Sequence, residues 1–483
     1  FALFCLTNNV ADPDLWGHIR FGSDIIERGA IPRFDGYSYT AYGRPWINHE
    51  WVAELIFAWL FRQWGRHGIV ALRLIGLIIL GVMIRRLQKG DSCSLEWRTI
   101  AAWLIISTVS YGLCFRPQLF SYFFFTLLLL LLTRKPKGYA VGIVAIFLVW
   151  ANAHGGFIVG LGAVALYSIA ACVNALRKGR LYEVVPALIL FAASVAVTLV
   201  NPYGVTFWSF LYDSVSMSRA YILEWAPIPL DVSSFMDFKA LAVIVILSAV
   251  ISRRPKTGWL LGLTILCGIA SIKHNRHMPF FAIAAAFFLP DHLNGMMERI
   301  HDPFGGFSKK ALHPLTLPYL IVSICILTAI PLYRGRSAFF LYVSPYQYPV
   351  AAVRWMKEQR IGGNCAVFFN WGEYLIWHLH DESKVSIDGR YETVYPVRVI
   401  DDNFDFFFAG DEWRNLIDRY PTELVLVHPL NPVSPLMAKL SDWALVFGSD
   451  TSLLFAKKQK FPTLSAQPPV VVRVSGSEMV PFP

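Results

Sequence analysis

Long apolar stretches separated by short polar segments recur along most of the chain, and this pattern is the main constraint on its fold. A helix needs about 20 mainly apolar residues to cross a bilayer, so the shorter stretches predict tilted or polar-ended helices. With residues 1–10 taken as the end of a first helix, the pattern predicts a polytopic α-helical membrane protein of about eleven spans. The stretches are 69–84, 99–115, 117–132, 139–151, 156–173, 184–200, 238–251, 258–272, 278–289 and 316–332.

Lys and Arg residues are concentrated in alternate loops. Basic loops remain in the cytoplasm, so the N-terminus is predicted to be cytoplasmic and the other loops to face outward from a bacterial inner (cytoplasmic) membrane. The net charge of +10 is mainly this topological signal, so nucleic acid is not an expected partner. The basic residues are Arg85, Arg86, Lys89 and Arg98; Arg134, Lys135 and Lys137; Arg177, Lys178 and Arg180; Arg253, Arg254 and Lys256; and Arg299, Lys309 and Lys310.

Composition divides the chain into a transmembrane domain, residues 1–335, and a less apolar tail. The first outer loop, residues 9–68, is predicted to hold two interfacial helices, at 17–28 and 50–62. Helices at 348–359, 374–379 and 411–420, alternating with strands at 365–370, 384–388 and 423–428 and a hairpin at 443–456, predict a small extracytoplasmic α/β domain over residues 345–460. Residues 461–483 are predicted to form an extended tail.

The first outer loop contains the candidate catalytic groups Asp12, Asp14, His49 and Glu50. A carboxylate can remove a proton from a hydroxyl nucleophile, and Asp12 with Asp14 could share a divalent cation, Mg²⁺ or Mn²⁺. The structural alternatives are that Asp12 caps the following helix and that Glu50 favours a helix start through the helix dipole. Asp35, beside Gly36, is a candidate substrate contact or a turn residue.

The later outer loops carry cations and polar groups that could bind an anionic ligand such as a lipid phosphate. Lys and Arg outside oppose the topological rule, so we expect an anion to offset them. Snorkelling, capping and a solvated charge cluster are the structural alternatives. The candidate substrate-binding residues are Arg116, Gln118, His154, Tyr203, Glu224, Lys273, His274, Arg276 and His277, with Asp35 from the first loop.

Three segments of the first loop, DPDLWGHIRFG, GAIPRFDGYSY and GRPWINHEW, resemble the class C (GT-C) membrane glycosyltransferases. Their pattern is similar to that of oligosaccharyltransferase catalytic subunits, protein O-mannosyltransferases and aminoarabinose transferases. It is most similar to uncharacterised bacterial multi-spanning members with DPDLW, NHEW and a tail domain with WGEYLIW and SIDGR. In the characterised families an acidic residue at the head of this loop is catalytic or metal-binding. The resemblance places Asp12 in that position, with Asp14 as its rival.

The chain also departs from the characterised families. It has no WWD-type motif in the tail, which argues against protein N-glycosylation. Pro13 separates Asp12 from Asp14, whereas the mannosyltransferase acidic pair is adjacent, so a metal requirement does not transfer.

The resemblance and the outer charges predict a glycosyltransferase that moves a sugar from a polyprenyl-phosphate or polyprenyl-diphosphate carrier, in contact with membrane lipid, to an acceptor outside the membrane. The acceptor could be a glycan, a lipid or a protein. A non-catalytic membrane scaffold or assembly subunit with the same fold is the alternative. A transporter is a weaker third candidate, since charged residues within the spans are few.

Overall fold

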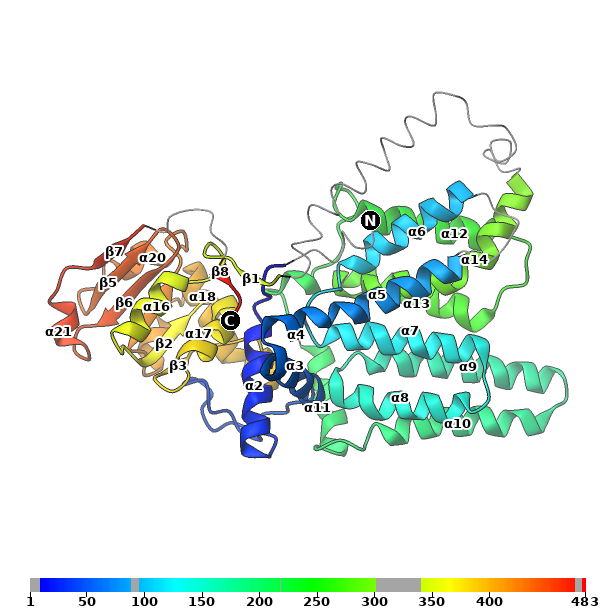
Figure 1. The fold of residues 1–483 in the computed structure, drawn as a ribbon, viewed down its shortest axis with the longest axis horizontal. Helices are drawn as coiled ribbons and strands as arrows, with labels where there is room; N and C mark the ends of the chain where they lie inside the picture. The colour runs from blue at the N-terminus through cyan, green and yellow to red at the C-terminus, as the bar shows by residue number, and fades with distance from the viewer. Residues whose placement is uncertain (1–8, 88–94, 218, 301–339, 474–479) are drawn as a thin grey trace, which may run out of the picture. The chain divides into compact units, whose positions relative to one another are not determined.

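The computed structural model describes residues 9–87, 95–217, 219–300, 340–473 and 480–483 (Figure 1). The chain divides into two compact units. We call residues 1–8 and 70–339 the helical unit, and residues 9–69 and 340–483 the mixed unit. The predicted span at 316–332 and the basic residues Lys89, Lys309 and Lys310 lie outside the described residues.

Helices in the helical unit occupy the other predicted apolar stretches. Most ends lie within five residues of the prediction, but the last helix continues 11 residues further, to Ile300, and the helix at Val205–Ser216 was not predicted. Their apolar side chains cover most of each helix surface, as expected for helices surrounded by other helices or lipid. The helices are α5 (Arg73–Leu87), α6 (Leu95–Ser110), α7 (Gln118–Arg134), α8 (Tyr139–Ala153), α9 (Phe157–Arg177), α10 (Val184–Val197), α11 (Val205–Ser216), α12 (Met236–Ile251), α13 (Gly258–Lys273) and α14 (Met278–Ile300). Short 3-10 turns cover Leu181–Glu183, Leu223–Trp225 and Asn275–His277.

Among the described residues, 3 helical segments are long and apolar enough to cross a membrane: Arg66–Leu87, Phe157–Arg177 and Asn275–Ile300. Shorter apolar helices cover Gln118–Arg134, Tyr139–Ala153, Leu181–Val197 and Gly258–Lys273. The total of about eleven spans therefore stays a prediction.

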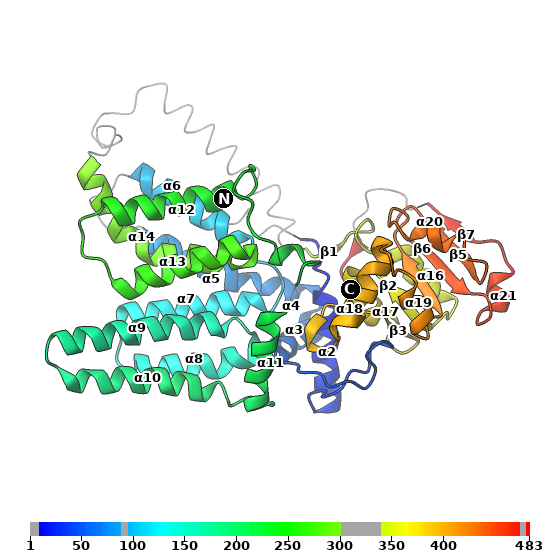
Figure 2. The ribbon, with the colours of Figure 1, turned by 180° about the vertical axis from the view of Figure 1, so that it is seen from behind.

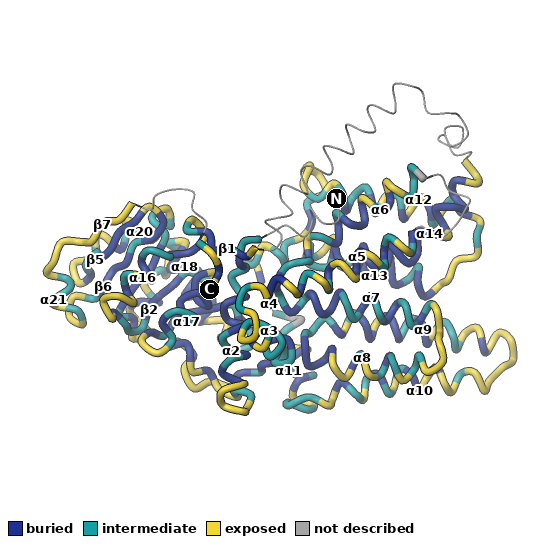
Figure 3. The backbone as a smooth tube through the Cα atoms, viewed as in Figure 1, coloured by how far each residue is buried: buried dark blue, intermediate teal, exposed yellow. Residues whose placement is uncertain are grey.

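Helix α14 is the centre of the helical unit, where it packs against α5, α6, α7, α12 and α13 (Figure 2). It is buried along nearly its whole length, including Phe280, Phe281, Phe287 and Phe288 (Figure 3). An all-round apolar surface is what a helix needs when neighbours surround it.

The mixed unit combines helices with a mixed sheet, as predicted for the tail. The sheet has the strand order β3-β2-β4-β6-β5-β7. Strand β2 is parallel to β3 and β4, β6 is antiparallel to β4 and β5, and β5 is parallel to β7. The strands are β1 (Tyr342–Val343), β2 (Gly363–Val367), β3 (Ser383–Val385), β4 (Leu424–Val427), β5 (Trp443–Ser449), β6 (Leu453–Lys457), β7 (Val470–Val472) and β8 (Val480–Pro481).

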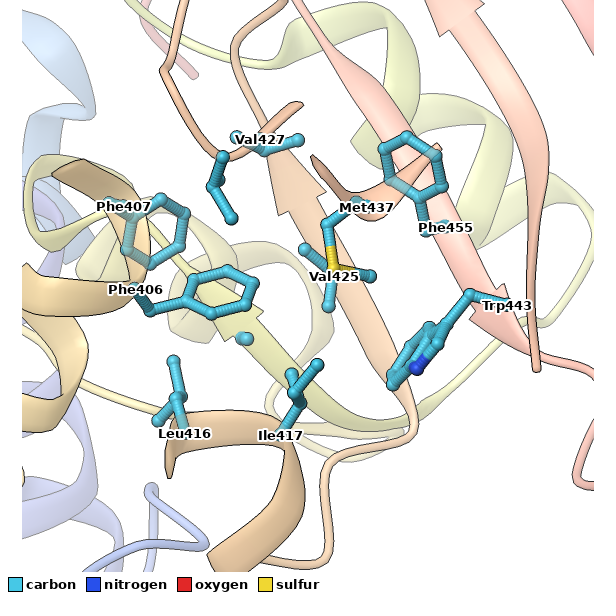
Figure 4. Close-up of a cluster of buried hydrophobic side chains, with 11 residues drawn as sticks. Phe406, Phe407, Leu416, Ile417, Val425, Val427, Met437, Trp443 and Phe455 are labelled. Carbon is cyan, nitrogen blue, oxygen red and sulfur yellow. The ribbon is translucent and has the colours of Figure 1, made fainter. Parts of the chain in front are cut away.

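Helices in the mixed unit come from both ends of the sequence. They are α2 (Leu15–Arg28), α3 (Trp51–Trp64), α4 (Arg66–Ala71, at the unit boundary), α16 (Val350–Glu358), α17 (Gly372–Leu379), α18 (Val397–Phe408), α19 (Asn415–Arg419), α20 (Ser434–Met437) and α21 (Pro462–Ser465). Helix α18 was not predicted. It packs Phe406 and Phe407 with Val425 and Val427 of β4 in a buried cluster (Figure 4).

The first loop joins the tail sheet directly. The backbone N–H of Tyr39 donates to the Val385 carbonyl and that of Val385 to the Tyr37 carbonyl, both at 3.1 Å. Strand β1 pairs with β8, and β7 extends the sheet beyond β5. The sequence analysis assigned residues 9–68 to the transmembrane domain and 461–483 to an extended tail. In the structure, residues 9–69 group with the described residues of the tail in the mixed unit.

Candidate functional site

The two aspartates at the head of the first loop have different surroundings. Asp12 Oδ1 accepts a hydrogen bond from the backbone N–H of Asp14 at 3.1 Å. Asp14 is the N-cap residue of α2, but its carboxylate makes no capping hydrogen bond. The N-cap position that the structural alternative gave to Asp12 is therefore occupied by Asp14, and Asp12 bonds to the backbone just before the helix.

A second group of ionisable side chains lies where α2 and α3 pack together. Their close approach depends on Gly22, because a Cβ there would overlap the backbone of Glu54. His18 Nδ1 is 3.9 Å from Glu54 Oε1, while Glu54 Oε2 accepts a hydrogen bond from Asn48 Nδ2 at 2.5 Å.

Glu50 is the N-cap residue of α3 and makes no capping hydrogen bond, and its Oε1 is 3.8 Å from His49 Nε2. The structure thus brings the predicted catalytic residues His49 and Glu50 close to His18 and Glu54, which the sequence analysis did not select. Glu50 does stand at the start of α3, where the helix dipole favours a carboxylate, as the structural alternative for this residue had it.

Burial controls the protonation of this group. It raises the pKa of Glu50, and the nearby charges of Glu54 and Asp14 add to the effect, although His49 and His18 oppose it. Burial alone would lower the pKa of His18, but the nearby carboxylates of Glu54, Glu50 and Asp14 outweigh it and raise that pKa. Perturbed groups gathered in this way are typical of functional sites.

Glu373, on α17, brings a tail carboxylate to the start of α2. Its Oε2 accepts the backbone N–H of Gly17 at 3.0 Å, and the residue is only 3% exposed. Burial, followed by the charges of Asp14 and Asp388, raises the Glu373 pKa well above its usual 4.5, while Arg390 and the Gly17 hydrogen bond act the other way.

The raised pKa of Glu373 predicts a pH-dependent stability. The folded chain keeps a proton that the unfolded chain releases above pH 4.5, so the mixed unit loses stability as the pH rises from there to the folded pKa. Glu373→Gln cannot release that proton. We expect the melting temperature of the variant to exceed that of the wild type by a margin that grows between about pH 5 and pH 8.

Melting in detergent, followed by intrinsic fluorescence, measures this margin. Glu358→Gln, at an exposed position on α16, is the matched control and should show a constant difference. A margin for Glu373→Gln that does not change with pH would show that Glu373 is already ionised at the lowest pH tested.

Asp35, predicted as a substrate contact or a turn residue, lies in a buried environment with a cationic partner. It is 2% exposed, and its Oδ1 is 2.7 Å from the guanidinium of Arg390. Its oxygens also accept the backbone N–H groups of Tyr37 and Ser38, each at 3.1 Å. The turn interpretation therefore fits Asp35 better than a substrate contact.

The same guanidinium binds a second tail carboxylate. Arg390 Nε and Nη2 donate to Asp388 Oδ1 and Oδ2 at 2.8 and 2.6 Å, and the Tyr395 hydroxyl donates to Asp388 Oδ2 at 2.6 Å. Arg390 also lies over the rings of Phe21, Tyr37 and Trp46. One cation thus joins the first loop to the tail within the mixed unit.

In the helical unit, two of the predicted ligand-binding residues contact each other. Arg116 Nη1 is 2.5 Å from Glu224 Oε1, across the turns before α7 and before α12. An anion that binds Arg116 therefore competes with the Glu224 carboxylate.

A second cationic group surrounds Trp225. The guanidinium groups of Arg219 and Arg276 lie 4.1 and 4.5 Å from its ring centre. His274 Nδ1 donates to the Trp225 carbonyl at 2.7 Å, and Asn275 Nδ2 donates to the Leu223 carbonyl at 2.8 Å. These bonds fix the predicted outer loop that contains Arg276, so its cation is held in place rather than solvated on a mobile loop.

The remaining predicted residues have less specific surroundings. His154 Nδ1 accepts the Gly156 N–H at 2.9 Å and lies 2.7 Å from Ser121 Oγ, which supports the interpretation as a tight turn. Lys273 is exposed at the end of α13, and His277 lies 6.1 Å from the Trp225 ring. The backbone N–H of Tyr203 donates to Asn201 at 2.7 Å, and Gln118 Oε1 is buried with no hydrogen-bond partner among the described residues.

The sequence analysis did not select Glu373, Arg390, Arg219, His18 or Glu54. A signal was present for the first two, because WGEYLIW and SIDGR, the tail motifs of the resemblance, contain Glu373 and Arg390. Their partners lie far away in the first loop: Gly17, for example, is 356 residues from Glu373, so local patterns could not pair them.

The metal hypothesis for Asp12 and Asp14 has little support from the side-chain arrangement. Within the described part of the chain, no group of 3 or more His, Cys, Asp or Glu side chains is arranged to hold a metal ion. One oxygen of Asp12 is already an acceptor for the Asp14 N–H. A divalent cation shared by Asp12 and Asp14 stays a prediction.

No protein-family model matches the sequence, and no curated protein matches it. Among solved structures, the chain is similar to the archaeal oligosaccharyltransferase AglB from Archaeoglobus fulgidus, solved with an inhibitory peptide and a dolichol-phosphate. The two chains share 12% sequence identity at a TM-score of 0.49, and the match covers 87% of this chain. It spans 66% of the length of AglB.

Proposed function

We propose that the protein is a membrane glycosyltransferase of the GT-C type that transfers a sugar from a polyprenyl-phosphate or polyprenyl-diphosphate carrier. The observation that carries the proposal is the group of ionisable side chains around the start of α2 and α3: Asp14, His18, Glu50 and Glu54, with Glu373 from the tail. Burying carboxylates near one another lowers the stability of the fold, and a scaffold without chemistry gains nothing from such a group.

In the proposed reaction, an acceptor hydroxyl attacks the anomeric carbon of the donor sugar. The bond between that carbon and the carrier phosphate oxygen breaks, and the phosphate leaves with the bonding electrons. A first-loop carboxylate, Asp12 or Asp14, accepts the hydroxyl proton, and Glu50 and His49 assist. The sequence analysis assigns Arg116, Lys273 and Arg276 to the departing phosphate, whose charge such cations would stabilise. In the topology predicted from the sequence, these loops all face outward from a bacterial inner membrane.

The experiment is to incubate the purified protein in nanodiscs with undecaprenyl phosphate carrying a radiolabelled sugar. The expected result is release of undecaprenyl phosphate that depends on an acceptor. Binding of these donors with no turnover for any sugar or acceptor would favour the assembly subunit instead.

Arg276 is the cation we expect to contribute most to donor binding. A guanidinium donates two parallel hydrogen bonds to a phosphate, and stacking on Trp225 fixes its plane. Arg276→Ala should weaken donor binding by about 1.5–3 kcal/mol, the range for a hydrogen bond to a charged group. Arg276→Lys should restore only part of the affinity, because an ammonium lacks the planar fork.

Donor affinity in nanodiscs, with melting as a check on folding, tests this prediction. Arg253→Ala removes an exposed Arg from a predicted cytoplasmic loop and should leave the affinity unchanged. Unchanged affinity for Arg276→Ala together with a large fall in melting temperature would make the Trp225 group structural.

A further inference from the structure

Glu373 connects the tail to Gly17, in the first turn of α2 and shortly after the predicted catalytic aspartates of the first loop. Its acceptor contact is with Gly17, three residues after Asp14, at 3.0 Å. Helix α17 packs against α2, which holds the Glu373 side chain in this position. The side chain therefore restrains the helix end from which Asp14 projects.

Glycines make room for this contact. A Cβ at Gly389 would lie 2.6 Å from both Asp14 Oδ1 and Glu373 Oε1, so the two carboxylates face the same small space above Gly389. A Cβ at Gly17 would overlap the Glu373 carboxylate. Any larger side chain at either position would force Glu373 or Asp14 to move.

Packing alone does not account for a glutamate at this position. An apolar side chain of similar size would fill the space but would leave the Gly17 N–H without its acceptor. A buried carboxyl beside other carboxylates lowers stability unless its partners compensate. The arrangement instead gives Asp14 a fixed neighbour on one side and leaves Asp12 bonded to the loop backbone.

We propose that Glu373 is a positioning residue for Asp14: by binding the Gly17 N–H and facing Asp14 across Gly389, it fixes the direction of the Asp14 carboxylate. This inference rests on the proposed function and deepens it, because it assigns proton removal from the acceptor to Asp14 rather than Asp12. Glu373 itself does not touch the substrate.

The test compares Glu373→Ala, Glu373→Gln and Gly389→Ala in the full-length protein, with undecaprenyl-phosphate sugar as the probe. Misplacement of a reacting group by about 1 Å can cost about 100-fold in rate. We expect Glu373→Ala and Gly389→Ala to lower kcat by about 10- to 100-fold with KM within about twofold. Glu373→Gln keeps an oxygen acceptor for Gly17 and should recover most of the activity.

Gly36→Ala is the matched control, because a Cβ at Gly36 would meet nothing within 4 Å. Hydrogen exchange at the Gly17 amide gives a second readout that needs no turnover. It should accelerate in Glu373→Ala and remain as in the wild type in Glu373→Gln.

The outcomes separate this inference from the proposed function. Full activity of Glu373→Ala, where Asp14→Asn is inactive, would overturn the positioning role and leave the glycosyltransferase intact. Activity lost equally in Glu373→Gln and Glu373→Ala, with Gly17 exchange unchanged in the Gln variant, would also overturn it, because the acid itself would then be required. If the wild type transfers no sugar, the proposed function fails, and Gly17 exchange still tests the contact. If Glu373→Ala does not fold, the positioning role is tested by the other two variants: it requires a lower kcat in Gly389→Ala and nearly normal activity in Glu373→Gln.

Discussion

Replacing Arg390 with alanine should destabilise the mixed unit by about 3–5 kcal/mol, the cost of leaving buried charges without their partner. The side chain of Arg390 is 4% exposed, and those of Asp35 and Asp388 are 0% exposed. Removing the guanidinium leaves both carboxylates buried and unneutralised, and exposes them to each other's charge. Urea unfolding in detergent, followed by fluorescence of the tryptophans, measures the change.

Arg414→Ala is the matched control for this prediction. Arg414 pairs with Asp418 on one face of α19, and both side chains are at least 50% exposed. An exposed pair of this kind contributes about 0–1 kcal/mol, so the variant should unfold almost as the wild type does. A similarly small loss for Arg390→Ala would mean that water reaches Asp35 and Asp388 and replaces the ion pair.

Asp14→Asn should lower the turnover of sugar transfer by about 100-fold or more, the scale of losing a general base. An amide has the same shape as the carboxylate but cannot accept the proton of the acceptor hydroxyl. Donor affinity and melting temperature should change little, because Asp14 makes no capping hydrogen bond to α2. Single-turnover release of undecaprenyl phosphate measures the effect.

Asp12→Asn is the natural comparison, since it makes the same carboxylate-to-amide change at the neighbouring aspartate. The Asn side-chain oxygen can still accept the Asp14 N–H, so we expect a smaller loss. A large loss in Asp12→Asn with normal activity in Asp14→Asn would return the reacting role to Asp12. Normal activity in both would leave only the assembly-subunit interpretation.

The sequence predicted the helices well because their apolar stretches are bounded by clear polar breaks. Helices α7, α8 and α13 begin within two residues of the predicted stretches. Helix α18 was missed, although Val399, Ile400, Phe404 and Phe407 follow helical spacing. Its DDNFDFFF segment mixes acidic and aromatic residues, which weakens an apolar pattern taken over a short window.

Sequence reasoning identified only part of the candidate site. Asp14 and Glu50 stand in a recognisable loop and could be selected for their chemistry. Glu373 and Arg390 lie in the tail motifs of the resemblance, but no local period encodes their contacts with Gly17 and Asp35 in the first loop. The ion-pair partner of Asp35 could not be predicted for the same reason, since Arg390 lies in the tail.

The joining of residues 37–40 to β3 has a consequence for how the protein is made. Residues 70–339 are synthesised between the two segments of the mixed unit. Chain synthesis proceeds at roughly 5–20 residues per second, so the first loop exists for tens of seconds before the strand it pairs with has been made. During that time Tyr39, Trp46 and the face of α2 that contains Trp16 have none of their tail partners. Contacts this distant in sequence also form slowly. Newly made chains should therefore depend on a chaperone or membrane surface that shelters the first loop until the tail arrives.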